Sequence, residues 1–227
     1  MDFLEKLQLE LKPGINEILQ HPFLQRIRSA ALTRKQLQFF VEQYHIYNSY
    51  FPRLLGALAA NITDDKTRLP IIENLWEEHG SGILEHSHRV LYERFAHAVG
   101  LDENDLAKVE PLSTTSICCE HLLETCMQDD FIRSLGVLGP GTEYFTNDEY
   151  QLIVDGLSQY DFLSESDLEF WTVHISLDVD HYDDMLAVIK PWCNSAENKH
   201  KVKVGAKKAI DLEILFWDGL EDSIENF

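Results

Sequence analysis

Basic residues are scarce in this sequence, and their scarcity excludes two classes of partner. The 227 residues include 39 acidic but only 19 basic side chains, which gives a formal net charge of −20. Such a surface repels both the phosphate backbone of nucleic acids and anionic lipid headgroups. We therefore expect no nucleic acid and no membrane surface as a partner.

Long apolar runs and paired cysteine motifs are also missing. No stretch approaches the roughly 20 apolar residues of a membrane-spanning helix. The first residues, MDFLEKLQLELK, include acids where a secretion signal carries bases. Cys118, Cys119, Cys126 and Cys193 have the spacing of neither a disulfide framework nor a zinc site. These features predict a cytoplasmic protein of the bacterial type with reduced thiols.

Alternation of apolar and polar residues, which marks half-buried strands, is hard to find. Apolar residues instead recur at helical spacing along nearly the whole chain. We predict an all-α protein with one domain over residues 1–227. The predicted helices, with boundaries good to about 2 to 4 residues, cover 2–20, 33–61, 64–79, 85–99, 103–128, 130–144, 147–158, 165–190 and 197–224.

The stretch HISLDVDH places two histidines and an aspartate on one face of a predicted helix. His174, Asp178 and His181 are spaced at i, i+4 and i+7, and Trp171 and Met185 continue the same stripe. The face is therefore apolar and expected to point inward, where unpaired polar groups cost several kcal/mol. A metal offsets this cost, since imidazole and carboxylate bind iron, manganese and zinc. The alternative is ordinary core or surface residues with a helix-internal hydrogen bond.

Two other segments carry acids and histidines that suit a metal site. They crowd the stretch LWEEHGSGILEHSH at residues 75–88, and an isolated acid, Glu143, follows in GPGTEY. A dinuclear carboxylate site in a helical bundle takes inward-pointing acids and histidines from several helices. The alternative is that Glu77, Glu78 and Glu85 form a solvated face.

Four motifs together resemble a known family. NLWEEHGSG, SHRVLYERFAHAVGL, LGPGTEY and HISLDVDH, in this order and at these separations, resemble the haem-oxygenase-like diiron oxidases and oxygenases. The closest kind is the iron-containing redox enzymes grouped with the chlamydial protein associating with death domains. Pyrroloquinoline quinone synthase C and thiaminase-type proteins are more distant. The resemblance covers nearly the whole chain and implies a haem-oxygenase-like bundle of about seven helices, with no haem.

The resemblance also implies a ligand set for two Fe(II) ions, with manganese or a mixed-metal centre as alternatives. Its members are Glu78, His88, Glu143, His174, Asp178 and His181. Glu77 is the alternative to Glu78, and His79, Glu85 and His86 are either indirect partners of the ligands or false leads. Two ferrous ions bring four positive charges and the three carboxylates remove three, so the remaining charge favours a further anionic ligand.

The resemblance implies O2 as co-substrate and oxidation of a small, amino-acid-like metabolite by N-oxygenation or by oxidative C–N or C–C cleavage. An external electron donor is a further candidate partner, and a homodimer is the expected assembly. Some relatives use an oxidisable tyrosine early in the chain. Here the matching stretch, HPFLQRI, contains Phe23 and Leu24, and the first tyrosine is Tyr44. We therefore expect a free metabolite as substrate.

A polar-aromatic stripe provides candidate substrate-binding residues. Tyr44, Tyr47 and Tyr50 follow at i, i+3 and i+6, and Arg53 comes three residues later. Tyr44 and Tyr47 are predicted to line a cavity above the metals, with Arg53 pairing with a substrate carboxylate. The alternative is that the stripe belongs to the core.

Three competing functions remain open at this point. A thiaminase-like hydrolase would use Cys118, Cys119 or Cys126 as its nucleophile. A non-catalytic interaction protein would keep the bundle without the chemistry. A single-metal protein would use only the three ligands of HISLDVDH.

Overall fold

The computed structural model describes residues 1–128 and 130–227, and within that part every side chain except those of 176–181. The described chain contains helices and no strand, so the prediction of an all-α fold is confirmed. The α-helices are α1 (Phe3–Leu19), α2 (Pro22–Arg28), α3 (Arg34–Asn61), α4 (Asp65–Glu78), α5 (His88–Val99), α6 (Glu103–Leu106), α7 (Ser113–Met127), α8 (Phe131–Leu138), α9 (Tyr144–Leu157), α10 (Glu169–Ile189) and α11 (Ala196–Ser223).

Capping residues fix where several helices begin. α1 follows Asp2 and α3 follows Thr33, and each cap accepts a hydrogen bond from the backbone N–H three residues on. The side chains of Glu5 and Gln36 accept in return from the backbone N–H of the cap residue. Both ends are capping boxes, which satisfy N–H groups that have no partner within the helix.

Three predicted helices have different boundaries in the structure. The predicted helix 103–128 divides into α6 and α7, and the segment between them contains Pro111, which has no backbone N–H to donate. Conversely, α8 and α9 join through a π-helical turn at Gly139–Glu143, where Tyr144 N–H donates to the Gly139 carbonyl five residues back. This turn lets the helix pass Pro140 without a break, and it ends on Glu143.

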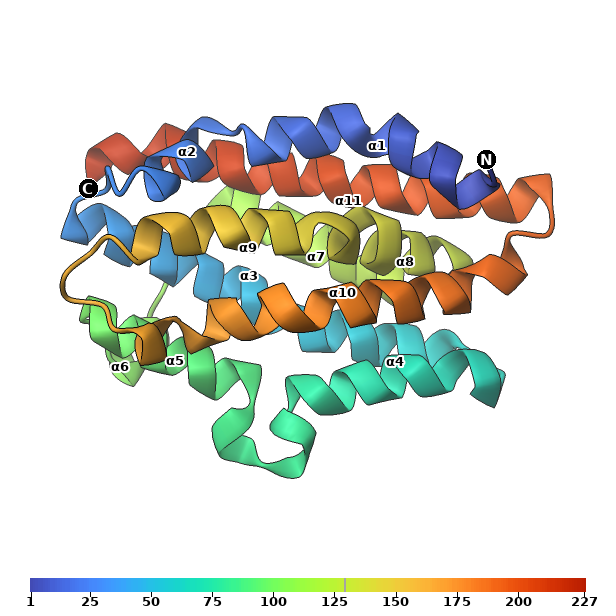
Figure 1. Cartoon of the computed structure of the whole chain (residues 1–227), viewed down its shortest axis with the longest axis horizontal. Helices are drawn as coiled ribbons and strands as arrows, with labels where there is room; N and C mark the ends of the chain where they lie inside the picture. The colour runs from blue at the N-terminus through green and yellow to red at the C-terminus, as the bar shows by residue number, and fades with distance from the viewer. Residues whose placement is uncertain (129) are drawn as a thin grey trace.

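The helices form a layered bundle with the first and last long helices on one side (Figure 1). α1 lies along α11, α11 packs against α7 and α8, and α10 packs against α9, α4 and α5. α3 contacts α4, α5 and α7 on the other side of the bundle. α10 therefore lies between α9 and the α4–α5 pair, where its inner face meets three neighbouring helices.

A cluster of aromatic rings fills the centre of the bundle. The ring centroid of Phe40 of α3 lies 6.1 Å from those of both Trp171 of α10 and Trp217 of α11. Phe23 of α2 lies 5.9 Å from Trp217, and Tyr44 lies 5.0 Å from Trp171. Such pairs add about 0.5–1.5 kcal/mol each beyond the apolar area they bury. These ring contacts hold α10 in place at Trp171, one turn before His174.

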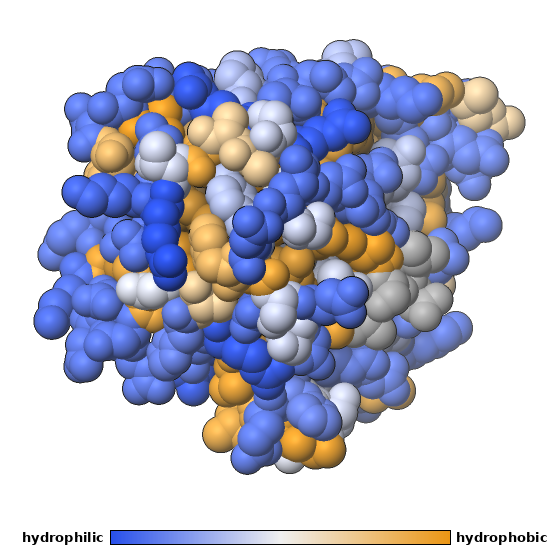
Figure 2. All heavy atoms as spheres, turned by 60° about the vertical axis from the view of Figure 1, so that its left-hand side comes forward, coloured by the Kyte–Doolittle hydropathy of each residue, from blue (hydrophilic) through white to orange (hydrophobic). Residues whose placement is uncertain are grey.

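The outer surface is largely hydrophilic on the face drawn in Figure 2, with apolar atoms in scattered groups. In the described part of the chain, no helix combines the length and the apolar character that crossing a membrane requires.

Candidate metal centre

A tight connection brings the end of α4 to the start of α5. Glu78 is the last residue of α4 and His88 the first of α5, and Gly80, Ser81 and Gly82 between them have φ angles of 69°, 52° and 88°. A Cβ on Gly80 would lie 2.6 Å from the Ser87 backbone nitrogen. Glycine is thus required there by both conformation and space, and the HGSG turn folds Glu78 back towards His88.

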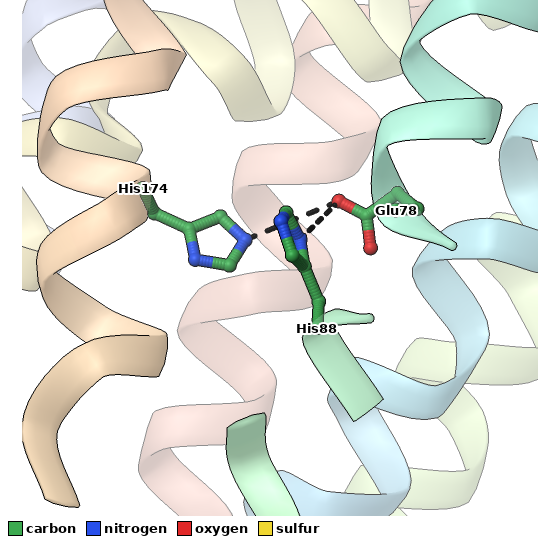
Figure 3. A group of neighbouring side chains, drawn as sticks. All are labelled: Glu78, His88 and His174. Carbon is green, nitrogen blue, oxygen red and sulfur yellow. Dashed lines mark hydrogen bonds and ion pairs between the residues drawn. The ribbon is translucent and has the colours of Figure 1, made fainter. Parts of the chain in front are cut away.

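Glu78, His88 and His174 converge from α4, α5 and α10 (Figure 3). The Glu78 Oε1 atom lies 2.8 Å from His88 Nδ1 and 3.9 Å from His174 Nε2. Each residue offers a ligand atom within 4.8 Å of those of the other two, and all three side chains are buried. The three segments singled out in the sequence supply this cluster together with Glu143, described next.

His174 is held in the orientation that a metal ligand needs. Its Nδ1 lies 2.6 Å from the carbonyl oxygen of Phe170. Because a carbonyl only accepts hydrogen bonds, Nδ1 carries a proton, and in the neutral ring Nε2, which faces Glu78, then has its lone pair available for a metal. A backbone partner on one ring nitrogen fixes the tautomer and the ring orientation of ligating histidines in this way.

Glu143 reaches the same end of α4 from the π-helical turn. Its side chain is buried, and its Oε1 accepts a hydrogen bond of 3.2 Å from Asn74 Nδ2. Asn74 lies one helical turn before Glu78 on α4. Glu143 and His174 also line one cavity, but among the described residues the group whose ligand atoms lie within 4.8 Å of one another consists of Glu78, His88 and His174 without Glu143.

The donor set fits a divalent metal ion. Glu78 and Glu143 are both 4% exposed, and burying carboxylates is unfavourable unless positive charge compensates them. Two carboxylates with two neutral imidazoles are ligands that iron and manganese accept. Asp178 and His181 lie one and two turns beyond His174 on α10, but their side chains are outside the described residues.

The other acids and histidines of residues 75–88 lie outside the cluster of Glu78, His88 and His174. Glu77 is half-buried and lines a separate groove with Asp184 and Met185. His79 is exposed, with its Nδ1 2.8 Å from the Leu75 carbonyl oxygen. Glu85 and His86 are also exposed.

A cavity of about 50 Å³ lies beside the cluster. Tyr44 and Tyr47 line it together with Glu143 and His174, and the Tyr44 hydroxyl donates a 2.8 Å hydrogen bond to that of Tyr150. Arg53 is exposed and is not among the described lining residues of this cavity. Its guanidinium lies 4.3 Å from the centre of the Tyr50 ring.

Two buried acids in the cavity wall were missed by the sequence analysis. Glu149 of α9 and Glu213 of α11 are each 3% exposed, and Trp217 Nε1 donates a 2.9 Å hydrogen bond to Glu149. Burial raises the pKa of Glu149 well above its usual range and that of Glu213 to about 7. The sequence could have indicated the burial of Glu213 by its position, because Glu213 falls on the same helix face as the apolar residues Ala209 and Phe216.

The cysteines named as alternative nucleophiles are poorly placed for that role. Cys119 lines the cavity, but burial raises the pKa of its thiol to about 12. Burial also raises the pKa of Cys126 to about 12 and that of Cys118 well above its usual range. A catalytic cysteine reacts as a thiolate, and these surroundings keep the thiols protonated.

An all-helical bundle with a buried Glu–His–His cluster beside an aromatic cavity defines a helical protein suited to hold a metal. The family model of the iron-containing redox enzymes matches residues 38–214. The chain belongs to this family.

Individual relatives agree with the family assignment. The chain is 28% identical over 217 residues to a 4-aminobenzoate synthase of Nitrosomonas europaea, covering 91% of this chain and 86% of that protein. It is 25% identical over 207 residues to a 4-chloro-allylglycine synthase of Streptantibioticus cattleyicolor, covering 91% and 78%. A CADD-like protein of unknown function from Nostoc punctiforme has the same fold, with a TM-score of 0.81, 18% identity and coverage of 97% and 96%.

Proposed function

We propose that the chain is a non-haem diiron oxidase or oxygenase that uses O2 to oxidise a small metabolite. The observation that carries this proposal is the buried cluster of Glu78, His88 and His174, beside a cavity whose wall includes His174. Membership of a family of iron-containing redox enzymes supports the choice of metal.

The chain's own residues would hold and orient the metal site. Glu78, His88, Glu143 and His174 are the proposed ligands whose side chains are described, and Asp178 and His181 are proposed from the sequence motif. The Phe170 carbonyl fixes the His174 ring and Asn74 fixes the Glu143 carboxylate. When bound, iron supplies the redox chemistry that transfers electrons to O2. The aromatic cavity wall limits access of water, which keeps electrostatic interactions in the site strong.

The substrate is proposed to be small and amino-acid-like. The cavity beside the cluster is small and is lined by aromatic, apolar and acidic side chains. Two relatives of this chain are named for products that combine an amino group with a carboxylate, 4-aminobenzoate and 4-chloro-allylglycine. A free molecule remains the proposed substrate, rather than a tyrosine of the chain itself. The stretch that matches the oxidisable tyrosine of some relatives holds Phe23 and Leu24, which are fully buried in the core.

The test is anaerobic loading of the purified protein with Fe(II), followed by removal of free iron, metal analysis and measurement of O2 consumption. We expect about two iron ions per chain and O2 uptake when air is admitted. His174→Ala should lose both properties while its circular dichroism spectrum stays helical. His86→Ala, which changes an exposed histidine of the same region, should retain both. Tight iron binding by His174→Ala, or none by the wild type, contradicts the proposal.

A further inference from the structure

The charged side chains that line the cavity are acids, and its basic group is the His174 imidazole of the metal site. Glu143, Glu149 and Glu213 line it, whereas its described lining residues include no lysine and no arginine. The cation expected from the sequence, Arg53, lies outside. Glu143 belongs to the proposed metal site, so Glu149 and Glu213 are the acids left to meet a ligand in this cavity, and they favour a positive group over a carboxylate.

Glu149 and Glu213 form a pair that the metal site does not use. Burial raises the pKa of both carboxyl groups, and each one influences the protonation of the other. Two adjacent buried carboxyl groups do not both ionise near neutral pH, so the pair is neutral while both protons are bound and carries one negative charge above about pH 7, once Glu213 has released its proton. Its described hydrogen-bond donors are the Trp217 indole and the Tyr47 hydroxyl, which are both neutral. A buried negative charge with only neutral partners is stabilised by a cationic ligand.

The rest of the cavity wall fits the body of an organic cation. Tyr47, Tyr50 and Phe51 supply aromatic rings, whose faces attract ammonium groups. Leu54 and Leu122 supply apolar surface for a hydrocarbon chain. An ammonium ion without such a chain would leave this surface unfilled.

We infer that the cavity binds a small primary amine, with its ammonium nitrogen against Glu149 and Glu213 and its carbon chain directed towards Glu143 and His174. The inference rests on the proposed function for the fate of the amine, but binding itself needs no iron. The acid pair determines specificity: it selects a cationic nitrogen over a neutral or anionic group of the same size.

The first test compares three probes of matched length on iron-free wild-type protein in the presence of a chelator. n-Butylamine, 1-butanol and butanoate are titrated by calorimetry and by the fluorescence of tryptophan, because Trp217 donates to Glu149. The expected result is butylamine affinity at least about tenfold above that of butanol, since a charge-assisted contact contributes about 1.5–3 kcal/mol, with no binding of butanoate. Equal binding of butylamine and butanol, or preference for butanoate, overturns the inference.

The second test replaces the acid without changing its shape. Glu213→Gln should weaken butylamine about tenfold or more and leave butanol unchanged, whereas Glu120→Gln, at an exposed acid one residue from the cavity-lining Cys119, should bind as the wild type does. If Glu213→Gln does not fold, Glu149→Gln is tested in its place, with the same expected result. Unchanged butylamine affinity in the folded variant overturns the inference. Amine binding by a protein that fails to load iron would contradict the proposed function alone.

Discussion

Glu77 and Glu78 are neighbours in sequence, but α4 turns about 100° between them, so they meet different surroundings. Glu78 lies in the buried cluster with His88 and His174, whereas Glu77 is half-buried beside a separate groove. The sequence could not choose between them, because either acid fits the motif and the choice depends on how α4 is rotated against α10.

The first prediction separates these two acids. Glu78→Ala should lose most of the iron that the wild type retains, because it removes the carboxylate next to both histidines. Glu77→Ala should retain iron close to the wild-type level. Metal analysis after gel filtration measures both variants under one protocol. Equal iron content in the two would remove Glu78 from the ligand set.

The second prediction concerns Asn74, which binds no metal in this scheme but donates to Glu143. Asn74→Ala should weaken iron affinity about 10- to 100-fold, the range found when a group that orients a ligand is lost. Competition with a chelator of known affinity measures the change. Asn198→Ala is the control, since its amide donates to the Trp192 carbonyl outside the cluster. Wild-type affinity in Asn74→Ala would assign the contact to packing alone.

At the scale of helices, a close crossing of α8 and α11 supports one side of the site. A Cβ on Gly205 of α11 would lie 2.0 Å from the Arg133 carbonyl oxygen, and one on Gly136 of α8 would lie 2.1 Å from the Val202 carbonyl oxygen. Each glycine therefore admits the backbone of the other helix. The crossing matters for the site because α8 continues into the turn that carries Glu143, and α11 carries Glu213.

The third prediction compares two glycine substitutions within helices. Gly205→Ala should lower the free energy of unfolding by about 1–3 kcal/mol, because the helices must move apart to admit the methyl group. Gly56→Ala, with nothing within 4 Å of the new Cβ, should raise it by about 0.5–1 kcal/mol through helix propensity. Urea unfolding measures both. Destabilisation of similar size in the two variants would refute the role of the crossing.

Sequence patterns predicted those helices whose ends carry local signals. Thr33 and Ser195 cap α3 and α11, so the predicted ranges 33–61 and 197–224 lie within a residue or two of the observed helices. The predicted ranges 130–144 and 147–158 place a gap at residues 145–146, whereas in the structure α8 passes into α9 through the turn at Gly139–Glu143 and α9 is continuous from Tyr144. The π-helical turn there depends on packing of Gly141 against Ala206 and Ala209 of α11, which no local pattern contains.

On the scale of the whole molecule, the net charge of −20 and the buried acids affect stability in the same direction. Mutual repulsion of surface carboxylates grows as pH rises and destabilises the compact state. Glu213 adds a separate contribution, because burial raises its pKa from 4.5 to about 7. Between these two values the folded protein holds a proton that the unfolded chain has released, so stability falls as pH rises through this window.

The fourth prediction isolates the contribution of Glu213. In iron-free protein, the free energy of unfolding should fall between pH 5 and pH 7.5, because burial raises the pKa of both Glu149 and Glu213, by about 1.4 kcal/mol per pH unit for each proton that only the folded protein retains. Glu213→Gln carries no titrating proton at this position, so its unfolding curve should decline less steeply. The difference in the free energy of unfolding between Glu213→Gln and the wild type should therefore shift in favour of the variant from pH 5 to pH 7.5.

Urea unfolding at several pH values measures this difference, with Glu120→Gln as the control for the loss of one surface charge. That variant should follow the wild-type slope, because its exposed carboxyl titrates alike in both states. Parallel curves for Glu213→Gln and wild type would mean that Glu213 is already ionised in the folded protein at pH 5. A shallower slope in Glu213→Gln alone would identify the buried acid, rather than surface repulsion, as the source of this part of the pH dependence.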